Sequence, residues 1–360
     1  MKIGLVRRGY SPTGGAENYL LRFAAAAEVA GHSCALFTEQ WPKEAWAGDY
    51  FRLGSNSPKP FADALRAARP RESCDFLFSL ERVWECDAYR AGDGVHAAWL
   101  EHRARFEPRW KSIFRRFSWK HQQTMALEKH LFGPAGARLV IANSQMVADE
   151  IGEHFGYPAE RIHLVHNGVP PFAVAAASRE ETRRALGLAD DHFLVLFAGS
   201  GWERKGLRFA IDAVNAMETL GVTLLVAGRG SRRKLPDSPR VRYLGPVADL
   251  ACYLAAADAF LLPTIYDPFS NACLEALAAG LPVITTAHNG FSEVIISGRD
   301  GEVVARADAT GSITQALQRW SDPARRIAAR PHLRLIAERL TMAENVRKTL
   351  TIIEMAGGVV

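Results

Sequence analysis

Short apolar runs alternate with longer segments whose apolar residues recur at helical spacing, in both halves of the chain. The runs have the length of buried β-strands, and turn-forming residues often separate them from the helical segments. The strands predicted in the first half are residues 3–6, 34–38, 76–80, 139–142 and 162–165. Those predicted in the second half are residues 193–197, 223–226, 241–244, 259–262 and 282–285. This alternation indicates βαβ units and parallel sheets.

A break in periodicity divides the chain at residues 167–178, where Asn-Gly, Pro-Pro and an alanine run occur. Because 360 residues exceed the usual size of one hydrophobic core, we predict two Rossmann-like domains, over residues 1–168 and 169–336. Residues 337–360 carry a helix, expected at 337–353, that returns to the first domain. The expected fold class is α/β, with two doubly wound domains facing a central cleft and ligands at the carboxyl ends of the strands.

Composition limits the class of protein, its compartment and its possible partners. Hydrophobic residues make up 48% and charged residues 23%, as in globular proteins, and no apolar run has the length of a membrane span. The first apolar run ends in two arginines, the reverse of the order in a signal peptide. The five scattered cysteines indicate reduced thiols in the cytoplasm. A formal charge of +5 indicates an anionic partner, either nucleic acid, a membrane surface or a phosphorylated substrate.

The first candidate site is the Gly14-Gly15-Ala16-Glu17 segment, which follows the first strand and opens a helix. Glycines let a backbone approach a ligand closely, and a helix N-terminus favours an anion. A tight turn without a ligand explains the same residues equally well. The third glycine of the GxGxxG dinucleotide fingerprint is absent.

Two further candidates lie in the second half. Arg204 and Lys205 follow a strand in a glycine-containing loop, where they could neutralise a departing diphosphate or remain solvated. In the segment 267–275, Ser270 or Asn271 is a suitable N-cap, and Glu275 one turn later could bind a ribose diol. Taken alone, that segment is also explained by a capped helix with surface carboxylates.

In combination, these motifs resemble the family 4 glycosyltransferases, which are retaining enzymes of the GT-B fold. The resemblance extends from Met1 to about Arg299. Its residues are Gly-Gly-x-Glu at 14–17, Arg-Lys-Gly at 204–206, acid-x7-Glu at 267–275, Ala-x-Ala-Ala-Gly-x-Pro-Val at 276–283, and the matching pieces 140–144, 166–169, 243–247 and 257–264.

The resemblance implies roles for the matching positions. Gly14 and Gly15 would approach the donor diphosphate through their backbone, and Arg204 and Lys205 would bind it. Glu275 would hold the ribose. Asp267, with the backbone of Phe269, Ser270 and Asn271, would hold the transferred sugar. The family usually has Glu at the position of Asp267 and often Arg at that of Ser200, which bears on sugar identity and on how the phosphates are bound.

Catalysis in the family also implies a histidine of the N-terminal domain, for which His96 is the candidate, and Asp93 is a candidate for acceptor binding. A hydrogen-bonded core histidine is the alternative. In a retaining enzyme of this kind the departing diphosphate can accept the proton of the acceptor, so no protein nucleophile is needed. The resemblance makes His96 and Asp267 the proposed catalytic residues. The chain contains no Asp-x-Asp triplet, and we expect neither a metal nor a cofactor, with UDP-hexose as co-substrate.

Residues 101–120 form a basic and aromatic segment with seven Lys or Arg and two Glu residues. Such a helix can lie in an anionic membrane interface or pack its aromatic stripe as core; nucleic acid is disfavoured because no recognised nucleic-acid motif accompanies the charge. Trp110, Phe114, Arg115 and Arg116 are the candidate membrane or acceptor contacts.

With Tyr89–His96 just upstream, this segment resembles the glycosyltransferases of bacterial lipopolysaccharide core assembly. That resemblance implies a hexosyltransferase at the cytoplasmic face of the inner membrane, acting on a phosphorylated lipid A core. Arg7 and Arg8 could then meet acceptor phosphates or remain solvated. The alternatives are an epimerase or phosphorylase of the same fold, or a peripheral membrane-binding module with a degenerate sugar-nucleotide site.

Overall fold

The computed structural model describes residues 1–11, 15–55, 57–108, 110, 118–169, 179–218, 221–233 and 235–358. The chain forms two compact units, Met1–His166 with Met342–Val360, and Asn167–Thr341. The predicted boundaries at 168/169 and 336/337 lie two and five residues from these divisions. The segment 170–178, which includes most of the predicted linker, lies outside the described residues.

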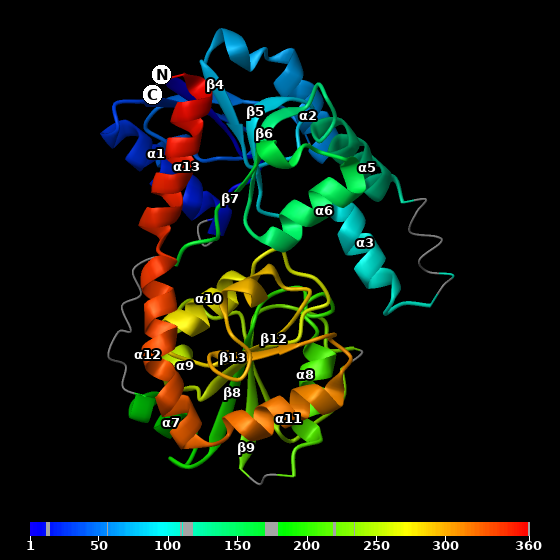
Figure 1. Ribbon diagram of the computed structural model, residues 1–360, viewed down its shortest axis with the longest axis vertical. Helices are drawn as coiled ribbons and strands as arrows, with labels where there is room; N and C mark the ends of the chain where they lie inside the picture. The colour runs from blue at the N-terminus through cyan, green and yellow to red at the C-terminus, as the bar shows by residue number, and fades with distance from the viewer. Residues whose placement is uncertain are drawn as a thin grey trace. The chain divides into compact units, whose positions relative to one another are not determined.

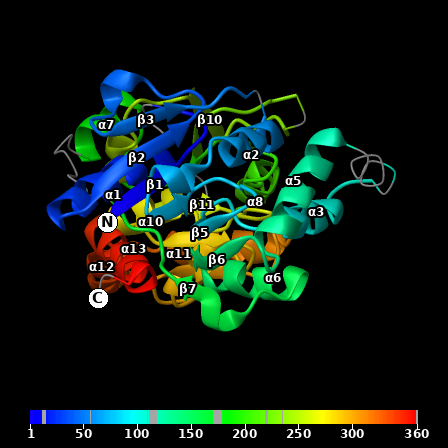
Figure 2. The same ribbon diagram turned by 90° about the horizontal axis from the view of Figure 1, so that it is seen from above.

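The first unit contains a parallel sheet of order β3-β2-β1-β4-β5-β6-β7. Figure 2 shows β3, β2, β1, β5, β6 and β7 following one another across the sheet. The strands are β1 (Lys2–Val6), β2 (Ser33–Thr38), β3 (Asp49–Arg52), β4 (Phe76–Ser79), β5 (Cys86–Ala91), β6 (Ala137–Ala142) and β7 (Ile162–Leu164). The five strands predicted for the first half are confirmed.

The apolar pattern missed β3 and β5. In β5, Asp87 and Arg90 interrupt the apolar run. Asp87 is nevertheless buried, because it accepts a hydrogen bond from the Leu77 N–H at 2.7 Å and pairs with Arg71 and Arg138. A charge with these partners can lie inside a sheet.

Helices cover the faces of the first sheet. They include α1 (Gly15–Val29), α2 (Pro58–Ala67), α3 (His96–Ala104), α5 (Trp119–Leu131), α6 (Gln145–Phe155) and α13 (Met342–Gly357). Helix α13 lies beside α1 (Figure 1), where the Tyr19 hydroxyl donates to Thr349 Oγ1 at 3.1 Å. Phe23, Leu350 and Ile353 belong to the same hydrophobic core, so the end of the chain completes the first unit.

The prediction of one helix over residues 337–353 is wrong. Helix α12 (Pro323–Arg339) ends before Leu340, and α13 begins only at Met342. The Val169 N–H donates to the Leu340 carbonyl at 2.8 Å, and Val169 bridges to Thr341. This pairing with a segment distant in sequence interrupts the helix where the chain passes from the second unit to the first.

The second unit is built on a parallel sheet of order β10-β9-β8-β11-β12-β13. Its strands are β8 (Phe193–Ala198), β9 (Val222–Ala227), β10 (Val241–Gly245), β11 (Ala259–Leu262), β12 (Val283–Thr286) and β13 (Gly301–Val304). Its helices include α7 (Arg179–Ala185), α8 (Leu207–Asn215), α9 (Ala251–Ala256), α10 (Asn271–Ala278), α11 (Thr310–Trp320) and α12. All five strands predicted here are confirmed, and β13 was missed.

Within the described ranges, no helix combines the length and apolar character that a bilayer span requires.

Candidate functional site

The loop that carries Arg204 and Lys205 is fixed against the carboxyl end of β11. The Arg204 carbonyl accepts hydrogen bonds from the Ile265 N–H at 2.8 Å and from Thr264 Oγ1 at 2.9 Å. Gly206 has a φ of +75°, and a Cβ there would lie 1.8 Å from the Pro263 carbonyl oxygen. Only glycine therefore allows this approach, which places Lys205 beside the segment that follows β11.

Lys205 and Asp267 form an ion pair with each other. Their side chains are only 14% and 5% exposed, so the pair is shielded from water. The Asp267 backbone is held on both sides, since its N–H donates to the His288 carbonyl and its carbonyl accepts from the Gly290 N–H, each at 2.9 Å. The structure thus brings together two residues that the sequence assigned to different parts of a donor.

Helix α10 begins shortly after Asp267 in the sequence. Ser270 is its N-cap, as predicted, and Ser270 Oγ accepts a hydrogen bond from the Cys273 N–H at 3.3 Å. Asn289, which is fully buried, accepts from the Ser270 N–H at 3.2 Å and fixes the entry into the helix. The other N-cap candidate, Asn271, is the first helical residue, and its side chain accepts from Asn167 at 2.8 Å.

Glu275 lies one turn into α10 and is half-buried. Within the described residues its carboxylate has no hydrogen-bond or ion-pair partner. Burial raises the pKa of Glu275 above its ordinary value, because the charged form loses hydration. A carboxylate in this condition can accept two hydrogen bonds from a vicinal diol.

Arg7 and Arg8, at the end of β1, lie close to carboxylates of the first unit. Arg7 pairs with Glu17 at 2.9 Å and with Glu81 at 2.8 Å, and Arg8 lies 3.6 Å from Glu39. Arg7 is thus not a solvated loop charge, and its role in acceptor binding stays a prediction. Gly15 is the first residue of α1, whereas Gly14 lies outside the described residues.

His96 is the first residue of α3, and Asp93 is exposed in the turn before it. His96 Nε2 lies 2.9 Å from Nδ1 of His121. Burial, the positive charge of Arg82 and the neighbouring His121 lower the pKa of His96 to about 4, so the ring is neutral near pH 7. A neutral imidazole offers one donor and one acceptor.

Of the basic and aromatic segment, Trp110 is described and is 59% exposed. Phe114, Arg115 and Arg116 lie outside the described residues. Trp119, at the start of α5, is 74% exposed. Contact of this segment with a membrane or the acceptor stays a prediction, because residues 111–117 lie outside the described part of the chain.

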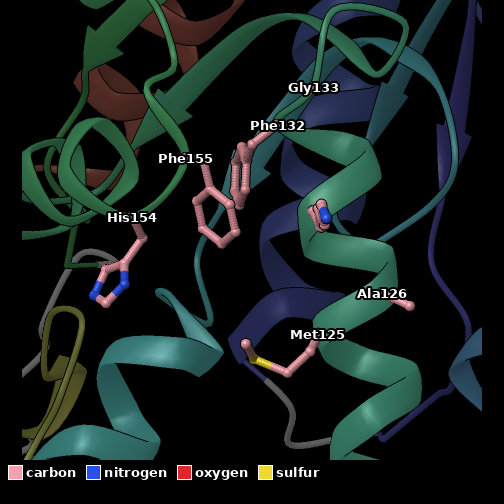
Figure 3. A pocket seen from close by; sticks show the side chains of 7 residues that line it. Met125, Ala126, Phe132, Gly133, His154 and Phe155 are labelled. Atoms are coloured by element: carbon pink, nitrogen blue, oxygen red, sulfur yellow. The ribbon is translucent and has the colours of Figure 1, made fainter.

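A hollow of about 510 Å³ lies between α5 and α6 in the first unit (Figure 3). Phe132, Phe155 and Met125 form its apolar part, and Lys129 and His154 add basic groups. None of the predicted site residues that the structure describes lines this hollow.

Several buried residues that hold the candidates in place have no motif by which the sequence would reveal them. Asn289 fixes the entry of α10, and Arg82 and Glu128 contact the turn before α3. The burial of Glu128 could have been inferred from its position between the apolar Leu127 and Leu131 on one helix face. Among the described residues, no group of three or more His, Cys, Asp or Glu side chains converges as a metal site would, and independence from metal stays a prediction.

Both family models that match the chain describe glycosyltransferases. The model for Glycosyltransferase Family 4 matches residues 13–171, and that for Glycosyl transferases group 1 matches residues 192–322. The chain is 25% identical over 352 residues to the lipopolysaccharide glucosyltransferase WaaG of Escherichia coli K12, covering 89% of this chain and 92% of that protein. It is 30% identical over 312 residues to a probable transglycosylase of Burkholderia thailandensis, covering 82% and 80%.

Other curated relatives are matched over about half of their length or less, among them an uncharacterized glycosyltransferase of Methanocaldococcus jannaschii, of which 44% is spanned at 30% identity. Among solved structures, the crystal structure of WaaG has a TM-score of 0.81 at 22% identity and covers 98% of this chain and 99% of that one. Anabaena HepE in complex with UDP-glucose has a TM-score of 0.71 at 19% identity, covering 98% and 99%.

Proposed function

We propose that this chain, which belongs to the family 4 glycosyltransferases and has their GT-B fold, transfers a hexose from a UDP-sugar to a glycolipid acceptor of the lipopolysaccharide inner core, with retention at the anomeric carbon. The observation that carries the proposal is the Lys205–Asp267 pair at the carboxyl edge of the second sheet, with Glu275, which has no side-chain partner among the described residues, on the helix that follows. The relatives support it, since WaaG is a lipopolysaccharide glucosyltransferase and HepE was crystallised with UDP-glucose.

In this proposal the second unit binds the donor. Glu275 accepts hydrogen bonds from the ribose diol, and Arg204 and Lys205 bind the diphosphate. When Lys205 turns to the phosphates, Asp267 is free to accept hydrogen bonds from hydroxyls of the hexose. Ordering charges around a departing diphosphate before the reaction stabilises the transition state.

The first unit provides His96 and Asp93 to the acceptor side of the reaction. The bond between the anomeric carbon and the diphosphate oxygen breaks while the acceptor hydroxyl forms its bond on the same face. The proton of that hydroxyl passes to the departing diphosphate, so no protein nucleophile is needed. The neutral His96 ring can hydrogen-bond a sugar hydroxyl without adding charge.

Binding at the cytoplasmic face of the inner membrane is the second part of the proposal. Trp110, with Phe114, Arg115 and Arg116, would enter the interface of anionic lipid, where each basic residue contributes about 1 kcal/mol. Salt weakens such binding. Co-sedimentation with anionic vesicles is expected to fall in Trp110→Ala plus Phe114→Ala and in 0.5 M salt (roughly a 4 Å Debye length). Equal recovery of variant and wild type would remove this part.

The central experiment combines binding with turnover. A thermal-shift panel of nucleoside diphosphates and nucleotide sugars is expected to show a rise in melting temperature with UDP-hexoses. UDP release should then require a truncated lipopolysaccharide acceptor, whereas an epimerase would convert the donor alone. The proposal is wrong if reversing the charge of both Arg204 and Lys205 leaves turnover intact.

Metal independence has a separate test. Turnover is expected to be unchanged in EDTA, because the two basic side chains and the N-terminus of α10 replace a divalent cation at the leaving group. Strict dependence on magnesium or manganese would contradict this.

A further inference from the structure

Glu128 is a fully buried glutamate on α5 to which the proposed reaction gives no task. Its carboxylate accepts hydrogen bonds from the N–H groups of His96 at 2.7 Å and Ala97 at 3.3 Å. These are the first N–H groups of α3, which have no partner inside their own helix. Arg82 Nε donates to the same carboxylate at 2.8 Å, so the buried charge is compensated.

Arg82 holds the other side of the same turn. Its guanidinium donates to the Gly94 carbonyl at 2.7 Å, and the Asn143 side chain donates to the Gly92 carbonyl at 3.3 Å. Gly94 has a φ of +68°, a conformation that favours glycine. The turn that leads into His96 is therefore fixed through its carbonyls and its amides at once.

The ring of His96 is fixed from α5 as well. The rings of His96 and His121 stack with centroids 5.0 Å apart, and one ring nitrogen of each lies 2.9 Å from the other. His121 and Glu128 are two helical turns apart, so both reach α3 from one face of α5. A hydrogen bond to one imidazole nitrogen decides which tautomer the ring adopts.

We propose that Glu128, Arg82 and His121 are positioning residues for sugar transfer: Glu128 and Arg82 set the backbone of the turn, and His121 sets the orientation and tautomer of the His96 ring. The inference rests on the proposed function, in which His96 acts at the sugar. A carboxylate that only capped α3 would affect stability and leave turnover unchanged.

The experiment compares two buried glutamates that face α3. Glu128→Gln keeps one acceptor oxygen and removes the charge, whereas Glu150→Gln does the same on α6, where Glu150 is 8% exposed and lies 3.9 Å from His102. Both variants are expected to lower the melting temperature. With UDP-glucose and truncated lipopolysaccharide, Glu128→Gln should lower kcat about 10- to 100-fold, because misplaced reacting groups cost that much.

The KM for UDP-glucose should change less than about twofold in Glu128→Gln, since the donor residues lie in the other unit. The control Glu150→Gln should keep kcat within about threefold, because Glu150 lies near His102 in the last turn of α3 and contacts neither His96 nor the turn before it. A folded Glu128→Gln with kcat within that same range would overturn the role of Glu128.

The role of His121 has a spectroscopic test that requires no turnover. The ¹⁵N shifts of the His96 ring are expected to report one tautomer in the wild type and a mixture in His121→Leu, with His121→Gln restoring the wild-type pattern and part of kcat. Unchanged ring shifts in His121→Leu would overturn the positioning of the ring. If Glu128→Gln does not fold, the His121→Leu and His121→Gln variants test the proposed positioning of His96. If the wild type transfers no sugar, the proposed function fails, and the ring shifts still test the positioning.

Discussion

The charged side chains at the carboxyl ends of the two sheets are paired to different extents. In the second unit a single Lys205–Asp267 pair lies beside a helix whose Glu275 has no protein partner among the described residues. In the first unit, Arg7 is bound by two carboxylates, and Arg82 is bound by Glu128 and lies 3.8 Å from Asp93.

This difference distinguishes charged residues that can bind a ligand from charged residues that stabilise the fold. A site that binds an anion needs a cation that can exchange partners and a carboxylate still free to accept hydrogen bonds, as in the second unit. Cations saturated by buried carboxylates stabilise a unit and fix its turns, as in the first. The same residue types therefore have different expected effects when they are changed.

The largest effect on transfer is expected for Lys205→Ala. It removes the cation nearest to Asp267 and should lower kcat/KM about 10²- to 10³-fold, the loss typical of one charge-stabilising group. Steady-state kinetics with UDP-hexose measures it. The matched control is Arg208→Ala, which removes an exposed cation three residues later and should change kcat/KM less than about threefold. A loss below fivefold in Lys205→Ala would break the comparison.

A smaller loss is expected for Glu275→Gln. UDP affinity should fall about 10- to 100-fold, because hydrogen bonds to a charged acceptor are lost. Without ligand the variant should be slightly more stable, since burial already disfavours the charged form of Glu275. Calorimetry with 2′,3′-dideoxy-UDP, which lacks the ribose diol, is the control. The wild type should bind this analogue as weakly as Glu275→Gln binds UDP. Equal loss of affinity for both ligands would argue against ribose binding.

A still smaller effect on transfer is expected for Arg7→Met, with the loss falling on stability instead. The buried Glu17 and the half-buried Glu81 would lose the guanidinium that pairs them, at a cost of about 3 kcal/mol in the free energy of unfolding. Urea denaturation measures this, and kcat/KM for the acceptor should change less than about threefold. A tenfold loss of kcat/KM in a stable variant would instead give Arg7 the acceptor role that its sequence position suggested.

The smallest effect on transfer concerns the charge of His96. Because burial, Arg82 and His121 lower its pKa to about 4, kcat should show no titration of this ring between pH 5 and 9. Stability should decrease as the pH falls from about 6.5 towards 4, since the unfolded chain then binds more protons than the folded one. The free energy of unfolding should drop by about 1–2 kcal/mol, allowing for the water around a half-buried ring. His96→Gln should flatten this decrease, and an unchanged slope would assign the acid sensitivity to other groups.

By itself, the sequence determined the parallel α/β architecture and ten of its strands, because apolar periodicity is a local property. It also limited the N-cap of α10 to Ser270 or Asn271, of which the structure has Ser270, and it identified the class of enzyme through the order of its motifs. It could not show β5, whose Asp87 is buried only because Arg71 and Arg138 reach it from distant segments.

Only the tertiary structure decided which charges meet. Lys205 and Asp267 are 62 residues apart, and Arg82, His96 and Glu128 come from three separate segments. The break at Leu340 likewise depends on Val169. The strength of an ion pair depends on distance and on exclusion of water, and both arise when the chain brings remote residues together.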